Sequence, residues 1–129
     1  MLRLQPGEDP REQLDRWCDE RSVEAASVTT AVGSLTKATI RYGGRSEGSV
    51  TEGDLEVCSL SGTLSRHGML LHLAIADASG QMTGGHMMNG CLVRTTLERV
   101  VQEFGGLRLL RKHDPATAYD ELFPEIIAP

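Results

Sequence analysis

The chain has 129 residues, a formal net charge of −5, 40% hydrophobic residues and 4% aromatic residues. This length is typical of one hydrophobic core, which here must be built mainly from aliphatic side chains. A protein that binds DNA by itself usually carries net positive charge, and base stacking needs exposed aromatic rings, so the composition argues against both.

The first elements predicted are a short strand and a helix. Residues 2–5 alternate apolar and polar side chains, as a strand does. Asp9, Pro10 and Glu12 form a helix-start signature, in which Asp9 caps the helix and Pro10 takes its first position. The apolar residues that follow have helical spacing, and we expect Trp17 to be a core anchor rather than a ligand-stacking residue.

Strand patterns dominate the next segment. Residues 23–32 are rich in Val, Thr and Ala, and we expect Gly33-Ser34 to interrupt them before an alternating strand over 35–42. The glycine-rich stretch 43–53 is predicted to be a loop or a wide hairpin.

The middle of the chain predicts a β-hairpin. Residues 55–65 and 69–77 should pair in antiparallel fashion, because the connection between them is too short for a parallel crossover. Asp77-Ala78-Ser79-Gly80 is a turn signal. It leads to a short segment, 81–83, which we expect Gly84-Gly85-His86 to end as a tight turn.

The last third holds two further strands. Residues 91–101 could form a strand or a helix, and their β-branched side chains favour the strand. Residues 107–112 are predicted to be the final strand, and 113–124 to be irregular structure. Together the elements predict a single α+β domain over residues 1–129, with a mainly antiparallel sheet packed against one or two helices. We expect surface left over by such strands to favour oligomerisation.

The segment Gly84-Gly85-His86 is the most distinctive local feature. Two consecutive glycines between strand-like segments indicate a backbone that either turns sharply or is approached closely by something else. His86 would then either contact a ligand or metal, or cap nearby backbone amides. Both interpretations remain open at this point.

His72 lies in the middle of an apolar strand, on the same face as Leu70, Ala74 and Ala76. We expect a core or interface histidine there, unless a tight turn brings His86 beside it and creates a metal or ligand site. Two imidazoles do not complete a zinc site, which usually has four protein ligands. A third ligand would come from a neighbouring subunit or from one of three side chains in this chain: Glu98, His67 or His113. Glu98 either orients a histidine or is a solvated charge.

The sequence lacks the motifs of several classes of enzyme and of secreted or membrane proteins. The chain has no GxSxG elbow, phosphate loop, dinucleotide fingerprint or HExxH element, so we expect a binding protein rather than an enzyme. The three cysteines lie far apart and fit a reducing compartment. The N-terminus lacks a signal-peptide pattern, and no apolar run approaches the roughly 18 residues of a membrane span, so a cytoplasmic location is expected.

Several segments, in their order and spacing, resemble the plants-and-prokaryotes conserved domain, which also occurs in plant nuclear proteins that carry AT-hooks. They are RLQPGEDPREQL (3–14), AVGSLTKATIRY (31–42), LEVCSLSGTLS (55–65), LHLAIADASGQMTGGH (71–86), NGCLVRTTLERVV (89–101) and HDPATAYDELF (113–123). The resemblance implies an antiparallel sheet packed with helices and assembled as a homotrimer. It also implies a binding or assembly module with a regulatory or DNA-associated role, whose partners would be DNA or a transcription-related protein. This chain has no AT-hook, so the hook-based DNA binding of the plant relatives is not implied.

The same resemblance implies metal or small-ligand binding as an alternative function. Prokaryotic members hold a metal with histidines from an HxH strand pair and from the GGH segment, and here His72 and His86 occupy two of those positions. Leu70 replaces the first histidine of the pair, which removes one candidate ligand. The alternative is therefore a metal- or small-ligand-binding protein, or an enzyme, with a divalent metal such as zinc at His72 and His86. Its ligand-binding residues would be Gly84, Gly85, His86 and Glu98.

Overall fold

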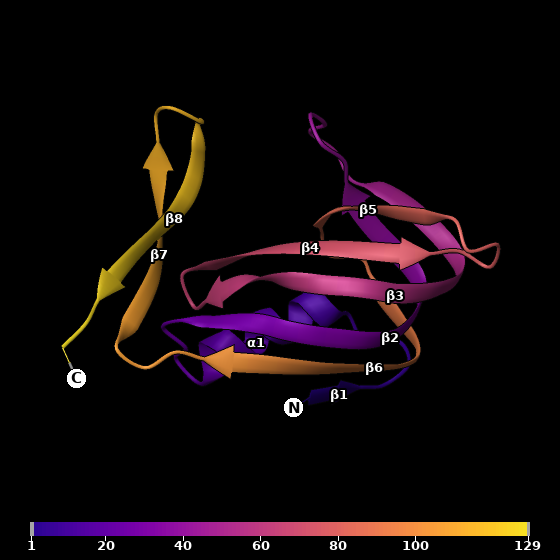
Figure 1. Ribbon diagram of the computed structural model, residues 1–129, viewed down its shortest axis with the longest axis horizontal. Helices are drawn as coiled ribbons and strands as arrows, with labels where there is room; N and C mark the ends of the chain where they lie inside the picture. The colour runs from indigo at the N-terminus through magenta and orange to yellow at the C-terminus, as the bar shows by residue number, and fades with distance from the viewer. Residues whose placement is uncertain (1, 129) are drawn as a thin grey trace.

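A computed structural model describes residues 2–128, which form one helix and eight strands in two antiparallel sheets (Figure 1). The elements are β1 (Leu2–Leu4), α1 (Pro10–Glu20), β2 (Ala26–Arg41), β3 (Ser49–Ser65), β4 (Gly68–Ala76), β5 (Met82–Met87), β6 (Leu92–Glu103), β7 (Leu107–Asp114) and β8 (Tyr119–Ile126). The predicted α+β class with a mainly antiparallel sheet is confirmed. None of the helical structure in residues 2–128 is long and apolar enough to cross a membrane.

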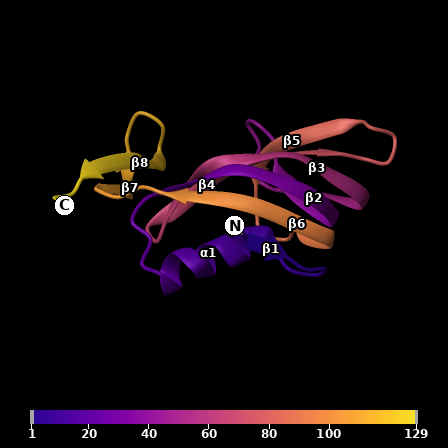
Figure 2. The same cartoon turned by 60° about the horizontal axis from the view of Figure 1, so that its bottom comes forward.

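Helix α1 forms where the capping signature predicts it. The Asp9 carboxylate accepts hydrogen bonds from the backbone amides of Arg11 and Glu12, at 3.0 and 3.3 Å, and Pro10 is the first helical residue. Such a cap satisfies amides that have no partner within the helix. Leu14 and Cys18 turn inward and are fully buried. The helix thereby packs on one face of the large sheet, as Figure 2 shows.

Strand β2 is the centre of the larger sheet, whose strand order is β1-β6-β2-β3-β4-β5. It pairs with β3 and β6 along most of its length, and its last residues pair with β5 as well. The predicted interruption at Gly33-Ser34 is wrong, because both residues lie within this continuous strand. A Cβ on Gly33 would collide with the Thr96 carbonyl of β6, so the glycine permits close strand packing where it was expected to break the strand.

Two other strand predictions need different boundaries. The loop expected over 43–53 is shorter, because β3 already begins at Ser49. The hairpin of β3 and β4 is confirmed, with Leu64 opposite Met69. The turn after β4 is also confirmed, and the Asp77 carboxylate accepts hydrogen bonds from the amides of Ser79 and Gln81, each at 2.9 Å. Residues 92–103 form strand β6, as the β-branched pattern favours.

The C-terminal segment differs most from expectation. Strand β7 lies where predicted, but the irregular structure expected over 113–124 is wrong, since Tyr119–Ile126 form β8 and pair with all of β7. The turn between them depends on Asp114, whose carboxylate accepts a hydrogen bond from the Ala116 amide at 2.8 Å. This hairpin projects beyond the end of the larger sheet (Figures 1 and 2).

The core lies between α1 and the curled sheet. It is formed almost entirely by aliphatic side chains, including Leu14, Leu35, Ile40, Leu55, Leu64, Leu71, Leu73, Ile75 and Leu97, with Trp17 packed against its edge. Burial of such side chains is the main favourable term in folding. The predicted aliphatic core is therefore confirmed, and Trp17, expected as a core anchor, packs against this core from a partly buried position.

A group of polar contacts anchors the β7–β8 hairpin to the rest of the chain. The Glu24 carboxylate accepts a hydrogen bond from Arg108 Nε at 2.7 Å, and it also pairs with Arg66 at 2.7 Å and with His67 at 3.1 Å. The buried Ser65 hydroxyl donates to the Leu109 carbonyl at 2.6 Å. These contacts hold the start of the hairpin in place.

Candidate functional site

The centre of the candidate site is a pair of histidines on adjacent strands. His72 on β4 is directly opposite His86 on β5. Their ring centroids are 6.3 Å apart and their planes meet at 77°, an edge-to-face arrangement. The structure thus brings together the two histidines that the sequence indicates.

The glycines beside His86 are not a turn. Gly84-Gly85-His86 lies within strand β5, so the predicted tight turn is wrong. A Cβ on Gly84 would lie 2.9 Å from the Leu73 carbonyl oxygen, and one on Gly85 would lie 2.8 Å from the Arg41 carbonyl oxygen. The close-approach interpretation of these glycines is therefore confirmed. They allow β5 to fit between β4 and β2 and to close the sheet.

His72 is not a core histidine. Along β4 the buried residues are Leu71, Leu73 and Ile75, whereas Leu70 and His72 are exposed on the opposite face. Residues two apart on a strand share a face, so Leu70 flanks the histidine pair. Its isobutyl side chain offers no metal ligand at the position where a further histidine would complete the set.

Arg41 extends the histidine pair into a row across three strands. It is directly opposite His86 in the pairing of β2 with β5, so Arg41, His86 and His72 are successive cross-strand neighbours. Burial lowers the pKa of His86 below its usual 6.5, and the charges of Arg41 and Arg11 lower it further, followed by that of His72. The His86 imidazole is therefore neutral at pH 7.

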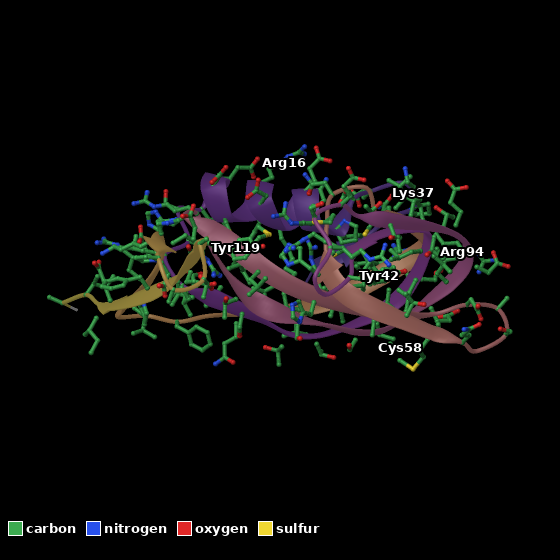
Figure 3. The ribbon with its side chains drawn as sticks, turned by 90° about the horizontal axis from the view of Figure 1, so that it is seen from above. Arg16, Lys37, Tyr42, Cys58, Arg94 and Tyr119 are labelled. Carbon is green, nitrogen blue, oxygen red and sulfur yellow. The ribbon has the colours of Figure 1, made fainter. Side chains whose placement is uncertain are left out.

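Two adjoining hollows border this row. The smaller, of about 250 Å³, is lined by Leu70, His72, Gly85, His86 and residues 41–43. The larger, of about 610 Å³, lies between the sheet and the β7–β8 hairpin, and we call it the groove. Its walls include Arg11, Arg41, Met69, Leu70, His86, Arg111 and Tyr119. Figure 3 shows Tyr119 on the side of the hairpin that is nearer the sheet.

Glu98 lies elsewhere in the sheet. It is exposed on β6, opposite Arg3 and Val32, and it lines neither hollow. Val32 and Arg41 are separated along β2 by about 30 Å at about 3.3 Å per residue. The structure therefore does not bring Glu98 to His72 and His86.

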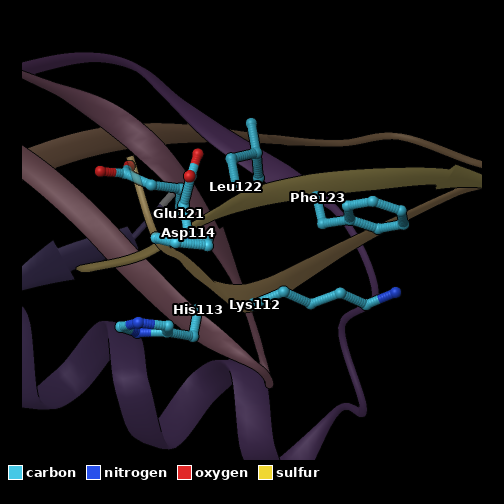
Figure 4. Close-up of a pocket in the computed structure, with 7 residues that line it drawn as sticks. Lys112, His113, Asp114, Glu121, Leu122 and Phe123 are labelled. Carbon is cyan, nitrogen blue, oxygen red and sulfur yellow. The ribbon is translucent and has the colours of Figure 1, made fainter. Parts of the chain in front are cut away.

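The other two histidines have separate surroundings. His67 lines the groove, but its Nε2 is 3.1 Å from the Glu24 carboxylate. His113 is on the hairpin, with its Nδ1 3.9 Å from Asp120, and lines a different hollow of about 280 Å³ (Figure 4). Residues 2–128 contain no group of three or more His, Cys, Asp or Glu side chains placed to hold a metal ion. Two imidazoles from one chain do not fit a closed zinc site.

The two buried thiols are not activated. Burial raises the pKa of Cys18 to about 12 and that of Cys91 to about 11, so both thiols remain protonated at neutral pH. Cys58 is exposed and projects from β3 (Figure 3). The cysteines therefore give no candidate site of their own, and the candidate site consists of the row Arg41, His86 and His72 together with the groove.

Sequence reasoning missed Arg11 and Arg41. Arg41 is on β2, and the pairing of β2 with β5 places it opposite His86. Arg11 is on α1, and its hydrogen bond to Asn89 holds it near the end of β5. The alternation of residues 35–42 does place Arg41 on the outward face, beside the buried Ile40. That pattern identifies an outward-facing arginine, which is half-buried in the structure, without showing which residues it faces.

Comparison with known proteins gives one family and several solved relatives. A family model described as the Plants and Prokaryotes Conserved (PCC) domain matches residues 1–105. A hypothetical protein from Salmonella enterica is 42% identical, with a TM-score of 0.94 over 97% of this chain and 91% of its own. A metal-containing protein from Archaeoglobus fulgidus is 26% identical, with a TM-score of 0.78 over 95% of this chain and 90% of its own.

Two further similarities are narrower. A candidate DNA-binding protein from Bacteroides thetaiotaomicron has a TM-score of 0.82 over 96% of this chain and 88% of its own, but its 16% identity shows the fold alone. The bifunctional protein GlmU of Synechococcus sp. (strain JA-3-3Ab) is 43% identical over 127 residues, which are 98% of this chain and 20% of the relative. The chain thus spans about a fifth of the length of the curated relatives it matches.

Proposed function

The chain belongs to the plants-and-prokaryotes conserved (PCC) domain family, and on this premise we propose that it is a cytoplasmic, homotrimeric binding and assembly module with a DNA-associated or regulatory role. We propose further that residues 1–129 act as one such domain. The absence of a recognisable catalytic motif in the sequence favours binding over catalysis.

The observation that carries the assembly proposal is the apolar surface of the β7–β8 hairpin. Four of its large apolar residues are strongly exposed: Tyr119 (64%), Leu122 (40%), Phe123 (46%) and Ile126 (90%). A strand pair that projects from a sheet with such side chains in water favours contact with another copy. The trimeric state itself comes from the family resemblance.

Size-exclusion chromatography with light scattering tests the assembly. We expect about three times the chain mass of 14.0 kDa. Phe123→Ser and Ile126→Ser should lower that mass, whereas Val50→Ser, at a comparably exposed position on β3, should not. A monomer at micromolar concentration would refute the trimer.

The proposed DNA-associated role is supported by the description of the Bacteroides relative, and it requires that the subunits assemble. A chain with a net charge of −5 lacks the overall charge for strong binding alone, so basic residues from several subunits would have to form a local patch. An electrophoretic mobility assay at low and moderate salt tests this role. The expected result is a salt-dependent shift with duplex DNA, and its absence with every duplex would remove the role.

A second candidate function is a metal or small-ligand site at His72 and His86, and the direct pairing of these two residues on adjacent strands supports it. The description of the Archaeoglobus relative as metal-containing supports the metal version. Because residues 2–128 bring only two imidazoles together here, any further ligands would come from another subunit. Elemental analysis should then give stoichiometric metal that His86→Ala loses and that His113→Ala, on the exposed hairpin, retains. Metal-free wild-type protein would exclude the metal version.

A further inference from the structure

Three arginine side chains from separate elements line the groove between the sheet and the hairpin. They are Arg11 of α1, Arg41 of β2 and Arg111 of β7. Within residues 2–128, none of the three forms an ion pair, whereas Arg66, Arg94 and Arg108 all do. Three guanidinium charges therefore border one groove without a carboxylate partner.

Neutral acceptors hold these guanidinium groups in place. Arg41 donates through Nη1 to the Arg45 carbonyl at 3.2 Å, and Arg11 donates through Nη1 to Asn89 Oδ1 at 3.0 Å. Arg111 donates through Nη2 to the Thr63 hydroxyl at 3.0 Å, while its buried Nε has no partner among the described residues. A guanidinium has five N–H donors, so each group is positioned by one bond and keeps both its charge and further donors.

The protonation of His86 responds to the positive charge of two of these arginines. It lines the groove beside Arg41, and the charges of Arg41 and Arg11 both act on it in the direction that disfavours the imidazolium. A neutral imidazole in this position can still donate one hydrogen bond. The end of the groove next to β5 is therefore electropositive and rich in donors, which suits an oxyanion.

The other residues that line the groove limit the class of ligand that can carry this oxyanion. Met69, Leu70 and Tyr119 add apolar surface, and a volume of about 610 Å³ is that of a small-molecule site. Two carboxylates, Asp120 and Glu121, lie on the hairpin wall. They would repel a polyanion such as a nucleic-acid backbone, but they leave room for a ligand with a single anionic head.

We infer that this groove binds a small organic anion, whose one carboxylate or phosphate head contacts Arg41, Arg11 and His86 and whose body packs against Leu70, Met69 and Tyr119. The inference rests on the small-ligand version of the second candidate function and gives its ligand a chemical class. It depends neither on a metal nor on the trimer.

The test is titration calorimetry of the full chain with inorganic phosphate, phenyl phosphate and benzoate, with the His86 imidazole resonance followed by NMR. Phenyl phosphate should bind more tightly than inorganic phosphate, because its ring can contact the apolar wall. Arg41→Gln and Arg11→Gln should each weaken the binding of phenyl phosphate at least about tenfold, as expected for the loss of a charged hydrogen bond. Arg16→Gln, on the outer side of the same helix as Arg11 (Figure 3), should leave it unchanged.

Two other outcomes would overturn the inference. In the first, millimolar phenyl phosphate leaves the His86 resonance of the folded wild-type protein unchanged. In the second, Arg16→Gln weakens the binding of phenyl phosphate as much as Arg41→Gln and Arg11→Gln do. Displacement by duplex DNA at equal phosphate concentration would assign the groove to nucleic acid instead. If EDTA abolishes binding, a bound metal and not the arginines holds the anion, and the inference fails. If metal-free protein still binds phenyl phosphate in EDTA, the inference is supported, and only the metal version of the second candidate function fails.

Discussion

His72 and His86 lie directly opposite each other on β4 and β5, with 6.3 Å between their ring centroids. The pairing register of two strands places them there, so their separation is a property of the sheet rather than of a loop. Leu70 lies two residues from His72 on the same face. The side chain at position 70 therefore decides whether this face presents two imidazoles or three.

We predict that Leu70→His creates a zinc site. A third imidazole on the same face would supply three nitrogen ligands, the number that many zinc sites with one open position use. Equilibrium dialysis followed by elemental analysis should show about one zinc per chain for the variant and much less for the wild-type protein. Val50→His places an exposed histidine on β3 without neighbouring imidazoles and should not gain zinc. Equal zinc content in both variants would contradict the prediction.

Gly85→Ala should lower the free energy of unfolding by about 1–3 kcal/mol, the usual cost of forcing atoms into a packed position. The new Cβ would lie 2.8 Å from the Arg41 carbonyl and 3.0 Å from the Ile40 side chain. Gly43→Ala is the matched control, because a Cβ there contacts nothing within 4 Å. Urea unfolding measures both variants. A Gly85→Ala protein as stable as Gly43→Ala would show that β2 and β5 do not need this close contact.

The lowered pKa of His86 predicts a pH-dependent stability. The unfolded chain, with the usual pKa of 6.5, binds a proton more readily than the folded protein. The free energy of unfolding should therefore decrease as the pH falls below about 6.5 and stop decreasing, for this group, below the folded pKa. In urea titrations, His86→Gln should remove this part of the dependence, and His113→Gln should preserve it. A His86→Gln profile identical to that of the wild-type protein would contradict the assignment.

Glu24→Gln should loosen the base of the β7–β8 hairpin. The hydrogen bond from Arg108, followed by that from His67 and the charge of Arg66, holds the pKa of Glu24 below its usual 4.5. The carboxylate thus contributes stability above about pH 4.5 that is lost as the pH falls through its folded pKa. We expect a loss of about 1 kcal/mol at pH 7, because the group is partly exposed. Faster amide exchange at Leu109, whose N–H donates to the Glu24 carbonyl, should accompany it.

The exposed Glu47 provides the control for that experiment, because it forms no ion pair within residues 2–128. Glu47→Gln should leave both the urea midpoint and the Leu109 exchange rate unchanged. If the two glutamate variants behave alike, the Glu24 contacts do not hold the hairpin.

Local rules predicted most of the elements. The Asp9-Pro10 cap, the β3–β4 hairpin, the Asp77 turn and the strand over 92–103 all follow from short-range patterns. Glycine misled the prediction at Gly33 and at Gly84-Gly85, where low strand propensity suggested a break or a turn. In each case the missing Cβ makes room for a neighbouring strand, which only long-range pairing reveals.

The same limit applies to the candidate site. The sequence indicated His72 and His86, and their register brings them together, but it gave no reason to separate Glu98 from them. Arg41 joins the site because β5 pairs with β2 as well as with β4, and Arg11 joins it through the packing of α1, where it donates to Asn89 beyond the end of β5. The β8 strand was missed because its exposed residues lack the alternation of a half-buried strand.

The three partners of β2 also constrain the order of folding. Its residue Ala26 pairs with both Leu64 and Glu103, so the central strand cannot complete its hydrogen bonds until nearly the whole family-matched region has been synthesised. Contacts so distant in sequence slow folding, whereas the β7–β8 hairpin pairs locally and can form quickly. During translation, β2 would therefore wait with one edge largely unpaired until β6 leaves the ribosome. That interval is when the nascent chain is most exposed to aggregation, and a chaperone would be of most use then.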